Sequence, residues 1–118
     1  MKEKFQELID WGCAFDEALA RFVGDEDLYA SCLGIFEKDE NFAPLDQALK
    51  EKNYDAAFEY AHTIKGVSGN LGLKPLFAST DALVSALRHH EYTNLDELHN
   101  TMQKDYDDFC SIAKKITG

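Results

Sequence analysis

His62 and Lys65 are the pair of residues in this sequence whose types and spacing best suit phosphoryl chemistry. A histidine ring is largely neutral near pH 7, and the neutral imidazole is a nucleophile that needs no separate base. If the surrounding stretch is helical, Lys65 lies one turn after His62, where its ammonium group can pair with phosphoryl oxygens. The first interpretation of the pair is therefore phosphoryl acceptance on His62, with Lys65 offsetting the added charge.

Two glycines share the helix face of His62. At about 100° per residue, Gly66 and Gly69 fall well away from a narrow stripe of mostly apolar residues. That stripe consists of Ala57, Ala61, Ile64, Ser68 and Leu71. A glycine inside a helix costs about 1 kcal/mol relative to alanine, so stability does not explain two of them. We expect another molecule to approach the helix backbone beside His62, and we assign Gly66 and Gly69 to partner docking.

Acidic residues avoid this part of the sequence. The chain has 22 aspartates and glutamates, and none of them lies between Tyr60 and Thr80. By proportion, about four would be expected there. An anion-free surface around His62 suits a group that must accept or carry phosphate.

Two other interpretations of His62 stay open. In one, His62 binds a metal ion with His89, His90, His99 or nearby acids, but no His-x-x-x-His pair is present, and adjacent residues on a helix do not face each other. In the other, His62 and Lys65 are ordinary surface side chains. The glycines and the missing acids argue against this last interpretation without deciding the question.

The sequence offers no transfer machinery of its own. It contains no glycine-rich nucleotide loop, no lysine-bearing phosphate cradle and no spaced carboxylate cluster of the kind that ATP-dependent enzymes use. A phosphoryl donor must therefore bring its own metal ion and catalytic groups. We expect a phosphoryl carrier rather than an enzyme, with no metal or cofactor bound by this chain.

Composition narrows the class of protein. The chain has 118 residues, enough for one domain over residues 1–118, and its formal net charge of −10 argues against nucleic acids and anionic membrane surfaces as partners. The segment Met1–Phe5 lacks the apolar run of a signal peptide, and no stretch is apolar over membrane-spanning length. Cys13, Cys32 and Cys110 are far apart in sequence, so we expect reduced thiols in a cytoplasmic protein.

Hydrophobic periodicity predicts helices along the whole chain and no strands. Asn53 is the predicted N-cap of the helix that carries His62, and Gly72 its left-handed C-cap. Earlier in the chain, Leu28, Cys32, Ile35 and Phe36 are expected to form a buried stripe. The predicted fold is all-α: an antiparallel up-and-down four-helix bundle over about 25–117, with short extra N-terminal helices as a cap over about 3–23.

The apolar residues of the first helix allow two interpretations. Leu8, Ile9 and Trp11 either cap one end of the bundle, which we favour, or remain partly exposed as a docking patch beside His62.

The segment that starts at His62 also resembles a known family signature. It runs His62-Thr-Ile-Lys65-Gly66-Val-Ser-Gly-Asn-Leu71-Gly72 and matches the pattern His-x-x-Lys-Gly, four residues, an apolar residue and glycine. This signature is that of the histidine-containing phosphotransfer (HPt) domain family. The stretch from Phe15 to Tyr29 and the approach to the histidine helix from Asn53 are similar to the same family.

The resemblance implies that His62 takes a phosphoryl group from a receiver-domain aspartate and passes it to another receiver in a two-component phosphorelay. It implies that Lys65 offsets phosphoryl charge and that Gly66 lets the receiver dock closely. Arg88, on the flank of the following helix, is carried over as a docking residue with less support. Magnesium is expected on the receiver, the partners are receiver domains and a hybrid sensor histidine kinase, and the protein is expected to be a monomer.

Two alternative functions accompany this hypothesis. One is a helical protein-binding adaptor that keeps the docking face but transfers no phosphate. The other is the phospho-accepting domain of a chemotaxis-type kinase. The second is less favoured because such domains usually belong to longer chains, whereas this sequence starts at Met1 and ends in a plain helix.

Overall fold

Helices account for all regular secondary structure in residues 2–117, the part of the chain that this computed structural model describes. In chain order they are a short 3₁₀ helix η1 (Lys2–Phe5), α1 (Gln6–Trp11), α2 (Phe15–Arg21), α3 (Glu26–Phe36), α4 (Phe42–Lys50), α5 (Tyr54–Asn70), α6 (Lys74–Arg88) and α7 (Leu95–Thr117). The prediction of an all-α protein is confirmed. No helix in this range combines the length and the apolar character needed to traverse a lipid bilayer.

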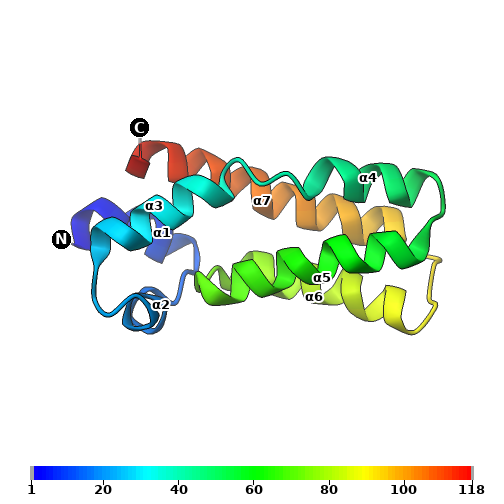
Figure 1. Cartoon of the computed structure of the whole chain (residues 1–118), viewed down its shortest axis with the longest axis horizontal. Helices are drawn as coiled ribbons and strands as arrows, with labels where there is room; N and C mark the ends of the chain where they lie inside the picture. Colours follow the sequence, from blue (N-terminus) through cyan, green and yellow to red (C-terminus); the bar gives the residue numbers. More distant parts are fainter. Residues whose placement is uncertain (1, 118) are drawn as a thin grey trace.

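The long helices lie along one another (Figure 1). Helices α3 and α4 follow each other along one side, α5 packs against α4 and α6, and α7 packs against α6 and α3. The chain reverses direction between α4 and α5, between α5 and α6, and between α6 and α7. Helices α1 and α2 lie at the end of the molecule where α5 ends. The N-terminal segment, residues 2–25, is therefore next to the C-terminal end of α5.

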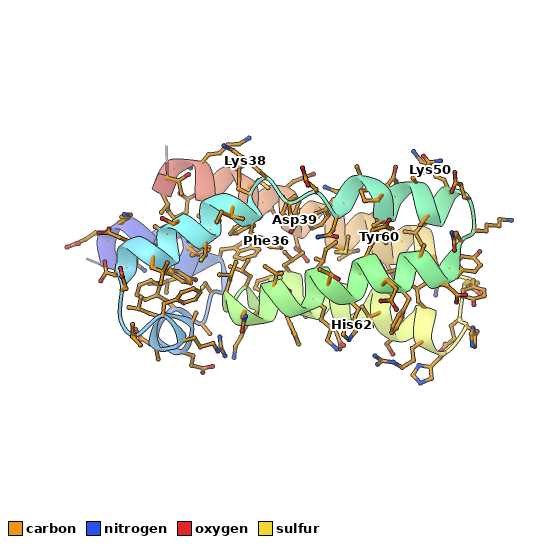
Figure 2. All side chains as sticks on the ribbon, in the orientation of Figure 1. Phe36, Lys38, Asp39, Lys50, Tyr60 and His62 are labelled. Atoms are coloured by element: carbon orange, nitrogen blue, oxygen red, sulfur yellow. The ribbon has the colours of Figure 1, made fainter. Side chains whose placement is uncertain are left out.

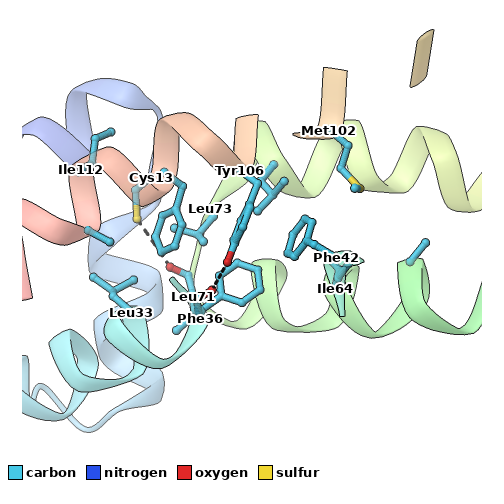
Figure 3. Packing of buried hydrophobic residues seen from close by; sticks show 14 of the residues in the cluster. Cys13, Leu33, Phe36, Phe42, Ile64, Leu71, Leu73, Met102, Tyr106 and Ile112 are labelled. Atoms are coloured by element: carbon cyan, nitrogen blue, oxygen red, sulfur yellow. Dashed lines mark hydrogen bonds between the residues drawn. The ribbon is translucent and has the colours of Figure 1, made fainter. Parts of the chain in front are cut away.

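One tyrosine of α7 holds the break between α3 and α4. The hydroxyl of Tyr106 donates a hydrogen bond to the carbonyl of Phe36, the last residue of α3, at 2.7 Å, and accepts one from the N–H of Asp39 at 3.3 Å. Its ring stacks on that of Phe42, the first residue of α4, with centroids 3.7 Å apart. Figure 3 shows these three aromatic rings together in the core. The carbonyl of Phe36 and the N–H of Asp39, which lie at the break between α3 and α4, therefore have a hydrogen-bond partner on α7.

The buried face of α3 differs from the sequence prediction. Leu28 and Ile35 were expected in the core, but they are 47% and 73% exposed. The buried residues of α3 are Tyr29, Ala30, Leu33 and Phe36. Phe36 is buried as predicted. The other expected residues precede the observed buried residues by one position each, which corresponds to a rotation of the helix by about 100°. The prediction for Leu28 and Ile35 was wrong, since periodicity alone does not distinguish these two faces.

Aromatic packing around Tyr29 decides which face of α3 is buried. Its ring lies 5.4–5.7 Å, centroid to centroid, from three phenylalanine rings of the N-terminal segment. These are the rings of Phe5, Phe15 and Phe22. Burying this aromatic cluster removes more apolar surface from water than burying Leu28 and Ile35 would.

Both ends of α5 have the predicted caps. The side chain of Asn53 accepts a hydrogen bond from the N–H of Ala56 at 3.3 Å, as an N-cap does. At the other end the chain leaves the helix through Gly72, whose φ of +75° is in the left-handed region.

Four consecutive carbonyl groups, the last two of α5 and the two that follow it, accept hydrogen bonds from Ala14, from Arg21 of α2 and from Tyr29 of α3. The pairs are Arg21 Nη1 with the carbonyls of Gly69 at 3.2 Å and Asn70 at 2.9 Å, Tyr29 Oη with that of Leu71 at 2.6 Å, and Ala14 N with that of Gly72 at 2.9 Å. Close approach at this point requires glycine, because a Cβ on Gly72 would lie 2.9 Å from the Ala14 carbonyl oxygen. Residues that precede α4 in the sequence thus hold the end of the helix that carries His62.

The apolar residues of α1 pack against the same end of the molecule. Leu8 is fully buried, Ile9 is partly buried against the core, and the Trp11 ring lies 6.3 Å from that of Phe109 in α7. These contacts support the interpretation that α1 caps the bundle, and they place Leu8 in the core rather than in an exposed patch. The division of the chain into a cap over 3–23 and a core over 25–117 stays a prediction.

We expect Tyr29→Phe to lower the free energy of unfolding by about 1–3 kcal/mol, because it leaves the buried Leu71 carbonyl with only the weak thiol donor of Cys13 at 3.7 Å. Burial raises the pKa of Tyr29, so its hydroxyl remains a donor at neutral pH. Urea denaturation followed by circular dichroism measures the change. Tyr92→Phe is the matched control, since its hydroxyl bonds to His90 at the surface, and it should change stability by less than about 0.5 kcal/mol. Equal effects of the two substitutions would contradict the role of Tyr29.

Candidate functional site

Helix α5 presents one closed face and one open face. The predicted stripe is buried, from Ala57 through Ala61 and Ile64 to Leu71, whereas His62 is exposed. Figure 2 shows His62 on the side of α5 that points away from α4. The imidazole is therefore open to another protein, as the sequence pattern predicted.

An aromatic ring one turn earlier on α5 lies beside the imidazole. The rings of Phe58 and His62 stack with centroids 5.7 Å apart and planes inclined by 29°. The guanidinium carbon of Arg88, on α6, lies 5.4 Å from the centroid of the same Phe58 ring. Phe58 was not singled out from the sequence, although an aromatic residue four positions before a histidine on a helix would have pointed to it.

A shallow hollow opens beside His62 and draws on three helices. Its lining residues are Arg21 of α2, His62, Lys65, Gly66, Gly69 and Asn70 of α5, and Phe77 of α6. The structure therefore brings together four of the five predicted site residues. Arg88 lines a neighbouring groove instead, together with Phe58 and Tyr92, so its contact with the site runs through Phe58.

Lys65 is held by two residues of α6. Its Nζ lies 2.8 Å from Oδ1 of Asp81 and 5.6 Å from the centroid of the Phe77 ring. The prediction of an anion-free surface was therefore wrong for the surroundings of Lys65. The stretch between Tyr60 and Thr80 does lack acids, but α6 packs against α5 and brings Asp81 to Lys65 from outside that stretch.

The two glycines of this face have different surroundings. A Cβ added at Gly66 would meet no described atom within 4 Å beyond its own helix and chain neighbours, so the space above it is open to a partner. A Cβ added at Gly69 would lie 3.1 Å from two ring carbons of Phe77, which gives Gly69 an internal packing reason. The docking role of Gly66 fits this geometry, and that of Gly69 stays a prediction.

Arg21 is a residue of the site that sequence analysis missed. It lies on α2, far from His62 in sequence, and its Nη1 donates to the carbonyls of Gly69 and Asn70 at the end of α5. A cation at this position interacts favourably with the negative end of the helix dipole. No local pattern around His62 points to Arg21, because only the fold places α2 against this end of α5.

The remaining histidines lie apart from His62. His89 and His90 are exposed at the end of α6, and His99 is half-buried on α7, where burial lowers its pKa. Among residues 2–117, no three side chains of the His, Cys, Asp or Glu type lie in an arrangement that could hold a metal ion. The absence of a bound metal or cofactor stays a prediction.

Comparison with known proteins identifies the family. The sequence matches the family model described as Hpt domain over residues 36–111, which is more than half of the 118-residue chain. The chain therefore belongs to the Hpt domain family, as the signature at His62 predicted. Members of this family are phosphocarriers of two-component signalling that interact with receiver domains. Searches of curated proteins and of solved structures found no match.

The matched region contains His62, Lys65, Gly66 and Arg88, whereas Arg21 lies outside it. The hydrogen bonds of Ala14 and Tyr29 to the end of α5 also start from residues that precede the match.

We expect Gly66→Ala to raise the free energy of unfolding by up to about 1 kcal/mol, because alanine favours the helix and its Cβ meets open space. Gly69→Ala is the matched control, and it should give a smaller gain or a loss, because the Phe77 ring must shift to accept the new Cβ. Urea denaturation of both variants measures the difference. A loss of stability in Gly66→Ala would show that this glycine serves the fold rather than the approach of a partner.

Proposed function

We propose that this chain is a histidine phosphotransfer protein in which His62 is the phosphorylated residue. In this proposal His62 accepts a phosphoryl group from the aspartate of one receiver domain and relays it to the aspartate of another. A hybrid sensor histidine kinase supplies the first receiver, and the carrier works as a monomer in the cytoplasm. The chain acts as a phosphohistidine intermediate and contributes no nucleotide site.

The observation that supports this proposal is the exposed, unobstructed surface around His62. The imidazole is exposed in the middle of α5, the space above Gly66 is free among the described residues, and Lys65 reaches the same hollow from the next turn. Membership of the Hpt family supplies the chemical context for this geometry.

The transfer step follows from the chemistry of the two reacting groups. A lone pair on a ring nitrogen of neutral His62 attacks the phosphorus of the receiver's aspartyl phosphate, a P–N bond forms, and the P–O bond breaks with its electrons returning to the aspartate carboxylate. The ring keeps its N–H proton, so the product is a phosphoimidazolium that releases this proton to solvent. A magnesium ion bound by the receiver would supply charge neutralisation for the phosphoryl group.

Residues of this chain serve mainly to position the acceptor. Phe58 restrains the imidazole, open space at Gly66 admits the partner, and Lys65 offsets negative charge on the transferred group. In this proposal the scaffold is an antiparallel up-and-down four-helix bundle, made by α3 with α4, α5, α6 and α7. Arg88 and Gly69 contribute to the docking face.

We expect His62→Gln to abolish labelling of the protein by a receiver domain that carries a radiolabelled phosphoryl group, because no other nucleophile of this kind lies on the open face of α5. His89→Gln changes an exposed histidine directly after α6; it is the control and should be labelled like the wild type. Mapping of the acid-labile, base-stable label by mass spectrometry identifies the modified side chain. A label that persists in His62→Gln would refute the assignment, and a receiver that binds without transferring its label would identify an adaptor.

A further inference from the structure

The ion pair between Lys65 and Asp81 lies beside His62, and a contribution to stability does not explain this position. It joins α5 to α6 with Nζ and Oδ1 2.8 Å apart, and the side chain of Asp81 is 50% exposed whereas that of Lys65 is 24% exposed. Ion pairs this open to water contribute little to stability in general. What distinguishes the pair is its place, because Lys65 lines the hollow beside His62.

Asp81 and Phe77 hold Lys65 from one face of α6. They are four residues apart, so they lie on neighbouring turns of the same helix face. The Lys65 ammonium group lies over the Phe77 ring, 5.6 Å from its centroid, while it contacts the Asp81 carboxylate. With His62 unphosphorylated, the main cation of the site is therefore already engaged by a carboxylate.

Phosphorylation of His62 would introduce a competing anion. A phosphoryl group carries between one and two negative charges at neutral pH and offers three acceptor oxygens. Lys65 is one turn from His62, so it must leave Asp81, or be shared with it, in order to reach that group. The other cation of the hollow is less available, since Arg21 Nη1 is engaged by two carbonyls at the end of α5.

We propose that Asp81 is a positioning residue that sets how tightly the phosphoryl group on His62 is held, by competing for Lys65. This inference rests on the proposed function of His62. An unopposed lysine would stabilise phosphohistidine and hinder its onward transfer, whereas Asp81 limits that stabilisation and keeps His62 able both to receive and to release the group. Asp81 acts through Lys65 and takes no part in bond making or breaking.

The test uses phosphoramidate, a small P–N phosphoryl donor that requires no receiver. At a fixed ratio of phosphoramidate to ammonia, the equilibrium fraction of phosphorylated His62 measures the transfer potential of the site, and ³¹P NMR or intact-protein mass spectrometry reads it. Asp81→Asn should raise the equilibrium constant for phosphorylation by about 3- to 10-fold, because it removes a competing charge close to the site. Asp81→Glu restores the carboxylate and should return the constant toward the wild-type value.

Asp108→Asn is the matched control for the loss of one exposed acid. Asp108 pairs with Lys104 on α7 at the same 2.8 Å, so the variant removes an ion pair of equal length and the same net charge outside the hollow. Its equilibrium constant should match that of the wild type. A rise equal to that of Asp81→Asn would attribute the effect to net charge and overturn the proposal.

The double variant Lys65→Ala/Asp81→Asn tests whether Asp81 acts through Lys65. In the Lys65→Ala background, Asp81→Asn should change the equilibrium constant by less than about 2-fold. The proposal is overturned if Asp81→Asn has no effect in the wild-type background, or if its effect is the same without Lys65. A wild-type protein that phosphoramidate labels at His62 while Asp81→Asn changes nothing refutes this inference alone. A His62 that neither phosphoramidate nor a phosphorylated receiver can label refutes the proposed function together with it.

Discussion

The orientation of His62 depends on how the C-terminal end of α5 is held. Carbonyls at a helix end have no partner within the helix, and leaving such a group buried and unpaired costs about 1–3 kcal/mol. In this protein the donors come from the backbone of Ala14 and from the side chains of Arg21 and Tyr29. Rotation of α5 about its axis would break these bonds and would also expose the buried stripe from Ala57 to Leu71. The two constraints together keep the open face of α5 turned toward solvent.

Charge around His62 is set by several helices rather than by α5 alone. Arg21 comes from α2, Lys65 from α5 and Asp81 from α6, in a chain whose formal net charge is −10. The charged residues that line the hollow are the cations Arg21 and Lys65, and Asp81 pairs with Lys65 from α6. Cations beside an exposed histidine suit the Hpt family, whose members are phosphocarriers of two-component signalling.

Most of the fold follows from local patterns in the sequence. The period of α5, its caps at Asn53 and Gly72, and its buried stripe are consequences of residues within one helix, and the structure confirms them. In α3 the same reasoning buried Leu28 and Ile35, because the face that contains them has the same spacing as the one that contains Tyr29 and Leu33. Contacts of Tyr29 with rings of the N-terminal segment and with the Leu71 carbonyl select the buried face, and neither contact has a signal in the local sequence.

The sequence by itself determined that His62, Lys65 and Gly66 share one helix face, since 3.6 residues per turn place them there whatever surrounds the helix. Only the tertiary structure decided that Asp81 meets Lys65, that Phe77 covers Gly69, and that Arg21 closes one side of the hollow. The physical reason is the range of the interactions. Helical periodicity acts over a few residues, whereas the contacts made by α2 and α6 exist only after the core has packed these helices against α5.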